Sequence, residues 1–217
     1  MNYQKILDKT IEELKSNNKI PRLLIHSCCA PCSSYCLEYL SEFFEITVLY
    51  YNPNIFPEDE YIYRMDEQER FIKEFPARHP IKLIKTAYTP DDFYDIAKGY
   101  EKELEGGERC TRCYRLRLEY TAKIAKELGM DYFTTTLSIS PLKDAKRLNS
   151  IGEELGAIYE VPYLVSDFKK KNGYKRSVEL SKEYDMYRQN FCGCVYSMRE
   201  MKEKQEMKKD KQEDKTV

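Results

Sequence analysis

The stretch Arg22-Leu-Leu-Ile-His26-Ser-Cys-Cys-Ala-Pro-Cys32 decides the fold that we expect for this chain of 217 residues. Its first half is a short apolar run, which is typical of a strand buried inside a parallel sheet. Its second half carries three cysteines directly after that strand. Ligands of parallel α/β sheets bind at the carboxyl ends of the strands. The stretch therefore predicts both the architecture and the place of a site.

The rest of the chain alternates between strand and helix patterns. We expect further strands at 45–51, 81–85, 131–136 and 159–165, and helices at 6–14, 33–43, 58–74, 91–98, 110–128, 142–155 and 177–187. Such alternation predicts a parallel sheet with helices on both faces. The expected fold is therefore α/β, a Rossmann-like sheet of the HUP or nucleotide-hydrolase type with a C-terminal helical extension. We expect residues 1–200 to form a single α/β domain and 201–217 to be a charged tail, either a frayed helix or disordered.

Composition limits the classes of function. The formal net charge is −1, so contact with nucleic acid requires a local basic patch rather than a basic protein. No stretch is long and apolar enough for a membrane span, and the N-terminus has no signal-peptide core. We therefore expect a cytoplasmic protein without membrane contact. Clustered cysteines there indicate metal ligands or redox catalysts more than structural disulfides.

The eight cysteines fall into three clusters, which are Cys28, Cys29, Cys32 and Cys36, then Cys110 and Cys113, then Cys192 and Cys194. The Cys110-x-x-Cys113 pair opens a predicted helix, whose N-terminus favours thiolates. Together with the adjacent Cys28 and Cys29 it supplies four thiolates. That number fits a [4Fe–4S] cluster and equally a structural zinc ion, and spacing alone leaves both open. Cys32 is a spare thiol that could ligate instead, and Cys36 suits a buried inert thiol.

Cys192-Gly-Cys194 differs from the other clusters because two thiols one residue apart close only a tight ring. A strained disulfide is easily reduced, so this pair favours electron exchange over architecture. The alternatives are two more metal ligands or two buried thiols. His26 leaves a similar choice between a core histidine and a functional one beside the thiols.

Polar and basic residues near the strand ends are the other functional signals. Asn52, Asn54 and the hydroxyls of 134–136 follow predicted strands, and Lys169-Lys-Lys171 with Lys175 suits an RNA backbone. The loop after the first strand contains no glycine. Because phosphate-cradling loops need glycine for close backbone approach, this absence argues against ATP binding there.

Five stretches together resemble the cobalamin-independent epoxyqueuosine reductase (QueH) family. They are His26-Ser-Cys-Cys-Ala-Pro-Cys-Ser33, Tyr51-Asn-Pro-Asn-Ile55 with Glu60-Tyr61 and Arg64, Arg109-Cys-Thr-Arg-Cys-Tyr-Arg-Leu116, Phe133-Thr-Thr-Thr-Leu137 with Ser140-Pro-Leu-Lys143, and Tyr187-Arg-Gln-Asn-Phe-Cys-Gly-Cys-Val-Tyr-Ser197. The resemblance runs from the first strand to the last helix and leaves out the residues before Pro21 and after Ser197.

The resemblance implies an oxidoreductase that completes queuosine synthesis on tRNA. Such enzymes remove the epoxide oxygen of epoxyqueuosine at the wobble position of the anticodon. It also implies a [4Fe–4S] cluster on Cys28, Cys29, Cys110 and Cys113, a redox-active pair at Cys192 and Cys194, an external electron donor of unknown identity, and an additional iron ion whose ligands are unassigned. We expect substrate contacts from Asn52, Asn54, Arg64, Thr135, Lys143 and Lys170, and proton transfer from His26, Tyr114 or water.

Three other functions remain open from the residues. A zinc-stabilised tRNA-binding module would be a colourless protein with metal bound. A thiol–disulfide redox protein would act on generic disulfides through Cys192 and Cys194. A tRNA ligase or thiolase of the same architecture would bind ATP.

Overall fold

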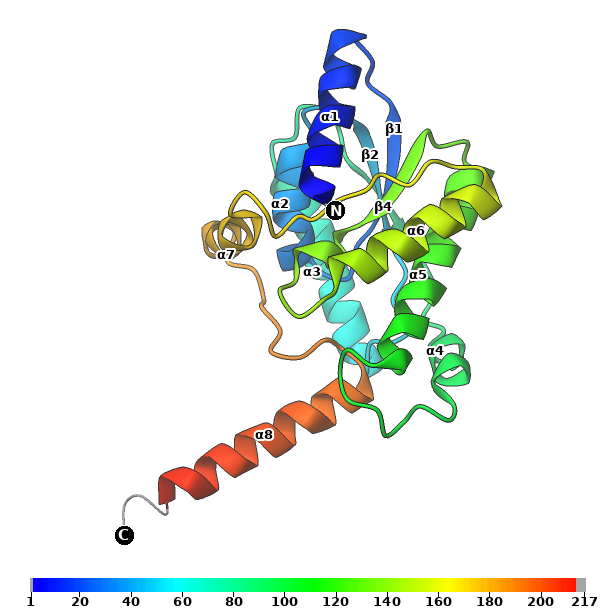
Figure 1. Ribbon diagram of the computed structural model, residues 1–217. Coiled ribbons are helices and arrows are strands. Elements are labelled where there is room, and N and C mark those ends of the chain that lie inside the picture. The colour runs from blue at the N-terminus through cyan, green and yellow to red at the C-terminus, as the bar shows by residue number, and fades with distance from the viewer. Residues whose placement is uncertain (1, 214–217) are drawn as a thin grey trace.

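Four parallel strands form the centre of the computed structural model, which describes residues 2–213 (Figure 1). They are β1 (Arg22–His26), β2 (Glu45–Tyr50), β3 (Lys82–Lys85) and β4 (Tyr132–Thr135), in the order β3-β2-β1-β4. β1 pairs with β2 from Arg22 opposite Glu45 and with β4 from Leu23 opposite Tyr132. This order matches one half of a doubly wound sheet. The expected Rossmann-like parallel α/β fold is confirmed.

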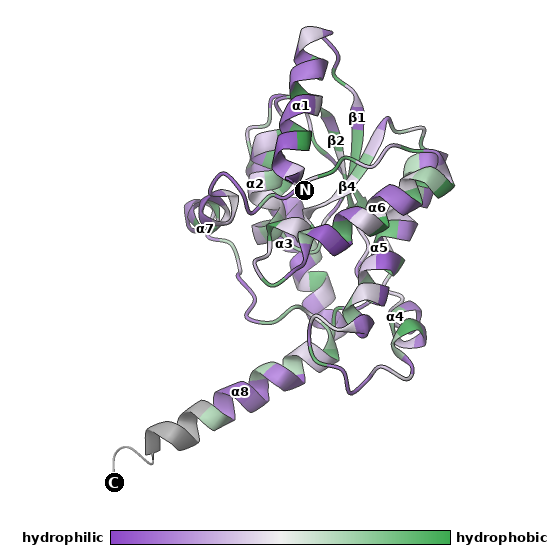
Figure 2. Cartoon of the chain, viewed as in Figure 1, coloured by the Kyte–Doolittle hydropathy of each residue, from purple (hydrophilic) through white to green (hydrophobic). Residues whose placement is uncertain are grey.

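Helices cover both faces of the sheet. They are α1 (Tyr3–Ser16), α2 (Ala30–Leu40), α3 (Glu58–Glu74), α4 (Pro90–Ala97), α5 (Glu108–Glu127), α6 (Ala145–Tyr159), α7 (Gly173–Glu183) and α8 (Val195–Glu213), with a short 3-10 turn η1 (Thr136–Ile139) after β4. Successive strand residues point to opposite faces. Leu23 and Ile25 therefore pack with α1, α2 and α3, whereas Leu24 packs with α5 and α6. In Figure 2, green apolar and purple hydrophilic segments alternate along these helices, as expected for helices with one apolar face.

The expected fifth strand at 159–165 is only one bridge. Phe133 pairs in parallel with Tyr163, held by the bonds from Phe133 N to the Pro162 carbonyl (3.1 Å) and from Leu164 N to the Phe133 carbonyl (2.8 Å). Pro162 has no N–H to extend the ladder. The segment therefore runs beside β4 and covers the edge of the sheet there, but it does not form a regular strand.

The predicted last helices have different limits in the structure. α7 starts four residues before the expected 177, and α8 continues without a break from 195 to 213 (Figure 1). The expected C-terminal helical extension is therefore confirmed. α8 runs through residue 200, after which the charged tail is expected to begin. Residues 214–217 of that tail lie outside the described residues. Between residues 2 and 213, no helix has the length and apolar character needed to cross a membrane.

Candidate functional site

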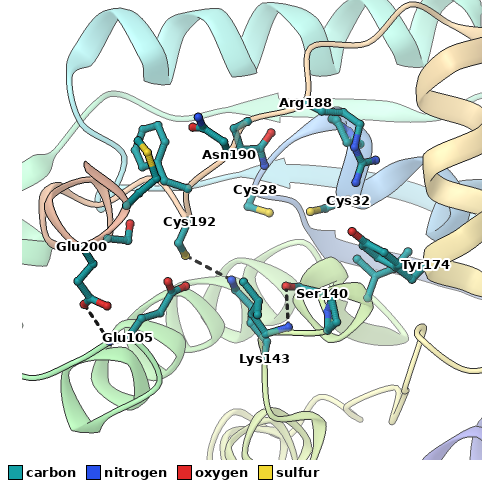
Figure 3. Close-up of a pocket in the computed structure, with 18 of the residues that line it drawn as sticks. Cys28, Cys32, Glu105, Ser140, Lys143, Tyr174, Arg188, Asn190, Cys192 and Glu200 are labelled. Atoms are coloured by element: carbon teal, nitrogen blue, oxygen red, sulfur yellow. Dashed lines mark hydrogen bonds between the residues drawn. The ribbon is translucent and has the colours of Figure 1, made fainter. Parts of the chain in front are cut away.

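A pocket of about 430 Å³ opens where β1 ends and the cysteine loop begins. Its walls come from the start of α2, the loop between η1 and α6, the segment before α8 and the first turns of α8. Figure 3 shows Cys28, Cys32, Lys143 and Cys192 facing this space. Sulfur atoms from two distant parts of the sequence thus meet at the strand edge, where ligands of such sheets bind.

Cys28, Cys29 and Cys32 form a triad at the start of α2. Their Sγ atoms all lie within 4.8 Å of one another, and the Sγ atoms of Cys28 and Cys29 are 3.7 Å apart. Pro31 favours helix at this point, so the helix begins directly after Cys29 and brings Cys32 back over the pair. Hydrogen bonds from Cys28 and Cys32 hold the pKa of Cys29 well below its usual value.

The second group of thiols lies on α5 and before α8. Cys110 and Cys113 lie in the first two turns of α5, and Cys113 packs with Cys194 against Phe93 and Ala97. Burial raises the pKa of Cys113 to about 12 and also raises that of Cys194. Burial therefore favours the neutral form of both thiols.

The predicted ligand set is spread over these two groups. Within residues 2–213, the triad Cys28, Cys29 and Cys32 is the one group of three or more metal-binding side chains whose ligand atoms lie within 4.8 Å. Cys110 and Cys113 do not belong to it. The spare thiol Cys32 thus lies with Cys28 and Cys29. A set of four ligands that includes Cys110 and Cys113 stays a prediction.

Buried cations surround the thiols. Lys143 Nζ lies 3.3 Å from Cys192 Sγ, and Arg117, which is 1% exposed, donates from Nε to the carbonyl of Cys113 at 3.2 Å. No ion pair to a carboxylate is found for either side chain among residues 2–207, whose side chains the structure describes. Burial lowers the pKa of Lys143. The opposing effects of Cys192, Tyr114 and Cys28 are together larger, so the pKa lies above its usual value.

These cations make the interior of the site positive. A charge removed from water needs a partner of opposite sign. Arg64 adds a third buried cation, which pairs with Glu60 at 2.7 Å, and its Nη2 has no hydrogen-bond partner among the described residues. Nη2 of Arg117 is also without one. The soft sulfur donors and the surplus of buried positive charge fit an anionic thiolate-bound metal centre.

Cys192 and Cys194 are both free thiols, and Gly193 shapes the turn between them. Its φ of +125° lies in the region that favours glycine, and a Cβ there would lie 3.1 Å from Ile55 and 3.2 Å from the Arg64 guanidinium. The Gly193 carbonyl accepts a hydrogen bond from Phe56 N at 2.9 Å. This hydrogen bond connects the turn to the loop after β2, and the turn lies beside the buried Arg64.

His26 lies in the core rather than in the pocket wall. It is fully buried, its Nε2 lies 3.1 Å from the Tyr51 carbonyl and its Nδ1 lies 3.0 Å from Thr135 Oγ1. A carbonyl only accepts, so Nε2 carries the proton and Thr135 donates to Nδ1. Burial, with Arg117 nearby, lowers the pKa of His26 to about 4. The neutral ring ties β1 to β2 and β4, and its catalytic role stays a prediction.

Of the six predicted substrate contacts, Lys143 lines the pocket. Asn52, Asn54, Arg64 and Thr135 are buried behind it, and Asn52 donates to the Ser27 carbonyl at 2.8 Å. In the part of the chain that the structure describes, the Oδ1 atoms of Asn52 and Asn54 have no hydrogen-bond partner. Lys170 is exposed on the turn before α7. Asn52 therefore supports the cysteine loop in the structure.

Several pocket residues escaped the sequence analysis. Gln189 donates from Nε2 to Cys29 Sγ at 2.9 Å, and Arg188, Asn190 and Glu200 line the same space (Figure 3). The signal for them is their position next to Cys192-x-Cys194, because a chain that brings these thiols to the pocket also brings its neighbours. Arg117 belongs to an arginine-rich helix start, a pattern that allows cations beside thiolates but does not show which of the arginines is buried.

The fold and the site define a class: an α/β protein with a thiol-lined, positively charged pocket at the carboxyl edge of a parallel sheet. The family model described as epoxyqueuosine reductase QueH matches residues 23–200. The chain belongs to this family, as the five stretches predicted.

Curated relatives agree with the family model. The epoxyqueuosine reductase QueH of Streptococcus pyogenes is 44% identical over 91% of this chain and 78% of its own length. That of Staphylococcus epidermidis is 44% identical over 91% and 84%. Among solved structures, the U34-tRNA thiolase NcsA from Methanococcus maripaludis with its [4Fe-4S] cluster is 13% identical, covers 89% of this chain and 67% of its own, and has a TM-score of 0.49.

Proposed function

We propose that the protein reduces epoxyqueuosine to queuosine at the wobble position of tRNA. Both carbon–oxygen bonds of the epoxide break, a carbon–carbon double bond forms, and two electrons and two protons convert the oxygen to water. The observation that carries the proposal is that thiols from separate segments, Cys28 and Cys32 on one side and Cys192 on the other, line one pocket together with the buried Lys143. This pocket combines reducing groups with a positive field for an oxyanion.

The thiol donor set supports an iron–sulfur cluster as cofactor. Cys28, Cys29, Cys110 and Cys113 would hold it, with Cys32 as the alternative ligand beside the pair. When bound, a cluster supplies electrons one at a time at low potential. Arg117 supports this assignment. Burial lowers its pKa, but Cys113, Cys192 and Cys28 outweigh burial and raise it, so one buried guanidinium lies within electrostatic reach of both thiol groups.

Cys192 and Cys194 fit the role of a two-electron store. Oxidation of the dithiol to a disulfide releases two electrons and two protons, so one epoxide and one dithiol give one alkene, one water and one disulfide. An external donor must then reduce the disulfide. Lys143 is suited to polarise the epoxide oxygen or to supply its proton, because it lines the pocket and its ammonium lies 3.3 Å from Cys192 Sγ.

The tRNA partner follows from the substrate. The anticodon loop presents the wobble nucleoside in a single strand, and enzymes that act on a base take it out of the stack into a pocket. A pocket of about 430 Å³ has the size of a small-molecule site and admits one nucleoside rather than a helix.

The test uses the whole protein purified without oxygen. We expect visible absorbance, iron and sulfide in the protein, and loss of one oxygen atom from epoxyqueuosine in a tRNA anticodon stem-loop, measured by mass spectrometry of the nucleosides. A colourless zinc protein that binds the stem-loop without turnover would replace the proposal by a zinc-stabilised RNA-binding module. Reduction of generic disulfides by the metal-free protein would favour a thiol–disulfide oxidoreductase.

A further inference from the structure

Tyr174 and Arg188 are two exposed side chains that lie together at the side of the pocket, the guanidinium over the ring. Both line it, Tyr174 is 41% exposed, and the Arg188 guanidinium lies 6.0 Å from the centre of its ring. In Figure 3 the two side chains lie on the side of the pocket that holds Cys32, away from Glu105 and Glu200. The ring therefore stands next to the thiols without being part of the thiol site.

The backbone under these two side chains is tightly packed. A Cβ on Gly173 would lie 2.0 Å from the Phe168 carbonyl and 2.4 Å from the Tyr35 ring, so α7 begins in direct contact with α2. Arg188 in turn donates to the Ser177 carbonyl at 3.3 Å and to Ser181 Oγ at 2.9 Å, both on α7. The ring and the guanidinium are thus placed by the same rigid helix.

Packing of the protein itself does not explain an aromatic ring here. Tyr174 lies outside the hydrophobic clusters of the described residues, and no hydrogen bond of its hydroxyl is found within residues 2–213. Large exposed rings beside a pocket are typical of surfaces that take a flat ligand.

We propose that Tyr174, flanked by Arg188, is a stacking platform for the nucleobase next to the wobble nucleoside. The inference rests on the proposed function and names the substrate contact that positions it. When the wobble nucleoside enters the thiol pocket, its neighbour loses a stacking partner, and a ring with a guanidinium beside it replaces that partner. The exposed Lys170, four residues before Tyr174, is placed to meet the RNA backbone leading to this base.

A thermodynamic cycle between protein and RNA tests the platform. The probes are anticodon stem-loops carrying queuosine, which is the product and does not react, either intact or with an abasic site directly 5′ or directly 3′ of it. We expect Tyr174→Leu to weaken binding of the intact stem-loop about tenfold, the order found for loss of one stacked base, whereas Tyr174→Phe keeps wild-type affinity.

The abasic stem-loops decide whether the ring stacks on a base. At one of the two positions, the abasic probe should bind wild type and Tyr174→Leu equally, because the ring has lost its partner. Equal losses from Tyr174→Leu with all three probes would overturn the platform, as would equal affinity of the Leu and Phe variants. Tyr63→Ala is the matched control, since Tyr63 is 52% exposed and is not among the pocket-lining residues.

Failure of this inference and of the proposed function are distinguishable. Binding of the product stem-loop needs no turnover, so a Tyr174-dependent cycle in a protein that fails to reduce epoxyqueuosine would keep the platform and refute the reductase. Turnover of the epoxyqueuosine stem-loop by Tyr174→Leu with an unchanged KM would refute the platform and keep the reductase.

Discussion

Lys143 Nζ lies 3.3 Å from the Sγ of Cys192, although 49 residues separate the two in the chain. The loop that carries Lys143 is held from behind by Lys169, whose Nζ donates to the carbonyls of Ser138 at 3.0 Å and Lys143 at 3.3 Å. A buried ammonium without a carboxylate partner is costly unless an anion lies beside it. The pair thus links the proposed electron store to the proposed site of oxygen release.

Replacement of Lys143 by Met should lower the single-turnover rate of epoxyqueuosine reduction about 100-fold, the usual scale for loss of a positioned proton donor. Lys143→Arg should recover part of that loss because it keeps the charge. Lys146→Met is the control, since Lys146 is exposed on the first turn of α6. Iron content should stay unchanged in all three variants, and an unchanged rate in Lys143→Met would remove the lysine from the mechanism.

Cys110→Ser should remove iron and visible absorbance, because the proposed centre needs thiolates from both segments. Cys36→Ser is the matched control. Cys36 is fully buried, and its Sγ lies 3.5 Å from the Cys32 carbonyl, so a serine hydroxyl can donate to the same oxygen. Full iron content in Cys110→Ser together with iron loss in Cys32→Ser would give the ligand position to Cys32.

The sequence was informative where local pattern and tertiary structure agree. The apolar run of β1 and the cysteines that follow it are adjacent in the chain, so their placement at one sheet edge could be predicted. The bridge at Tyr163 could not, because Pro162 limits pairing in a segment whose composition suits a strand. Asn172-Gly173 has the composition of a turn, yet it begins α7, because only glycine fits between Phe168 and Tyr35.

The site shows the same limit. Cysteine spacing pointed to the thiols, but the groups that tune them come from distant positions. Gln189 reaches Cys29 across 160 residues of sequence, and Arg117 is buried only because α5 packs against β1. Contacts of this kind depend on how helices dock, which no local pattern encodes.

Glu67 fastens the segment that leads to the redox pair, and its pKa predicts how stability depends on pH. Glu67 accepts from Arg70 Nη2 at 2.8 Å and from Tyr187 N at 3.0 Å, and Arg70 donates on to the Tyr184 carbonyl at 2.8 Å. The hydrogen bonds from Arg70 hold the pKa of Glu67 below its usual value of 4.5. A lowered carboxyl pKa contributes stability above pH 4.5 that is lost as the pH falls through the folded-state value.

Glu67→Gln should therefore lower the free energy of unfolding by about 1 kcal/mol at pH 7 and by clearly less at pH 3, measured by urea denaturation. Glu74→Gln removes the other carboxylate that pairs with Arg70. Because the Glu74 side chain is 46% exposed, this variant should lower the free energy of unfolding less than Glu67→Gln does. A difference between wild type and Glu67→Gln that is equal at both pH values would contradict the assignment of the shift to this residue.

The basic stretch before α7 should act through Lys170 more than through its neighbours. Lys171 pairs with Asp8 at 2.7 Å and Lys169 with Asp167 at 3.0 Å, whereas no ion pair of Lys170 is found in residues 2–213. Lys170→Ala should reduce the slope of log Kd against log salt for tRNA by about one, as for one phosphate contact. Lys171→Ala should change it less. If wild type and Lys170→Ala have the same salt slope, Lys170 does not contact an RNA phosphate and the prediction is wrong.

Cys192 and Cys194 should be needed for repeated turnover but not for the metal centre. Cys194 is buried and accepts from Ser197 N at 3.4 Å, while Cys192 faces the pocket and Lys143, so one thiol is accessible and the other is screened. That asymmetry suits a pair in which Cys192 exchanges electrons with the outside and Cys194 closes the disulfide.

The double variant Cys192→Ser/Cys194→Ser separates the remaining roles. It should keep its iron, its visible absorbance and its affinity for the stem-loop, yet convert at most one epoxyqueuosine per protein molecule, measured by mass spectrometry under excess substrate. Loss of iron would make the pair part of the ligand set, and undiminished multiple turnover would exclude the dithiol as the electron store. Cys36→Ser serves again as control, since it removes a thiol that faces neither the pocket nor the pair.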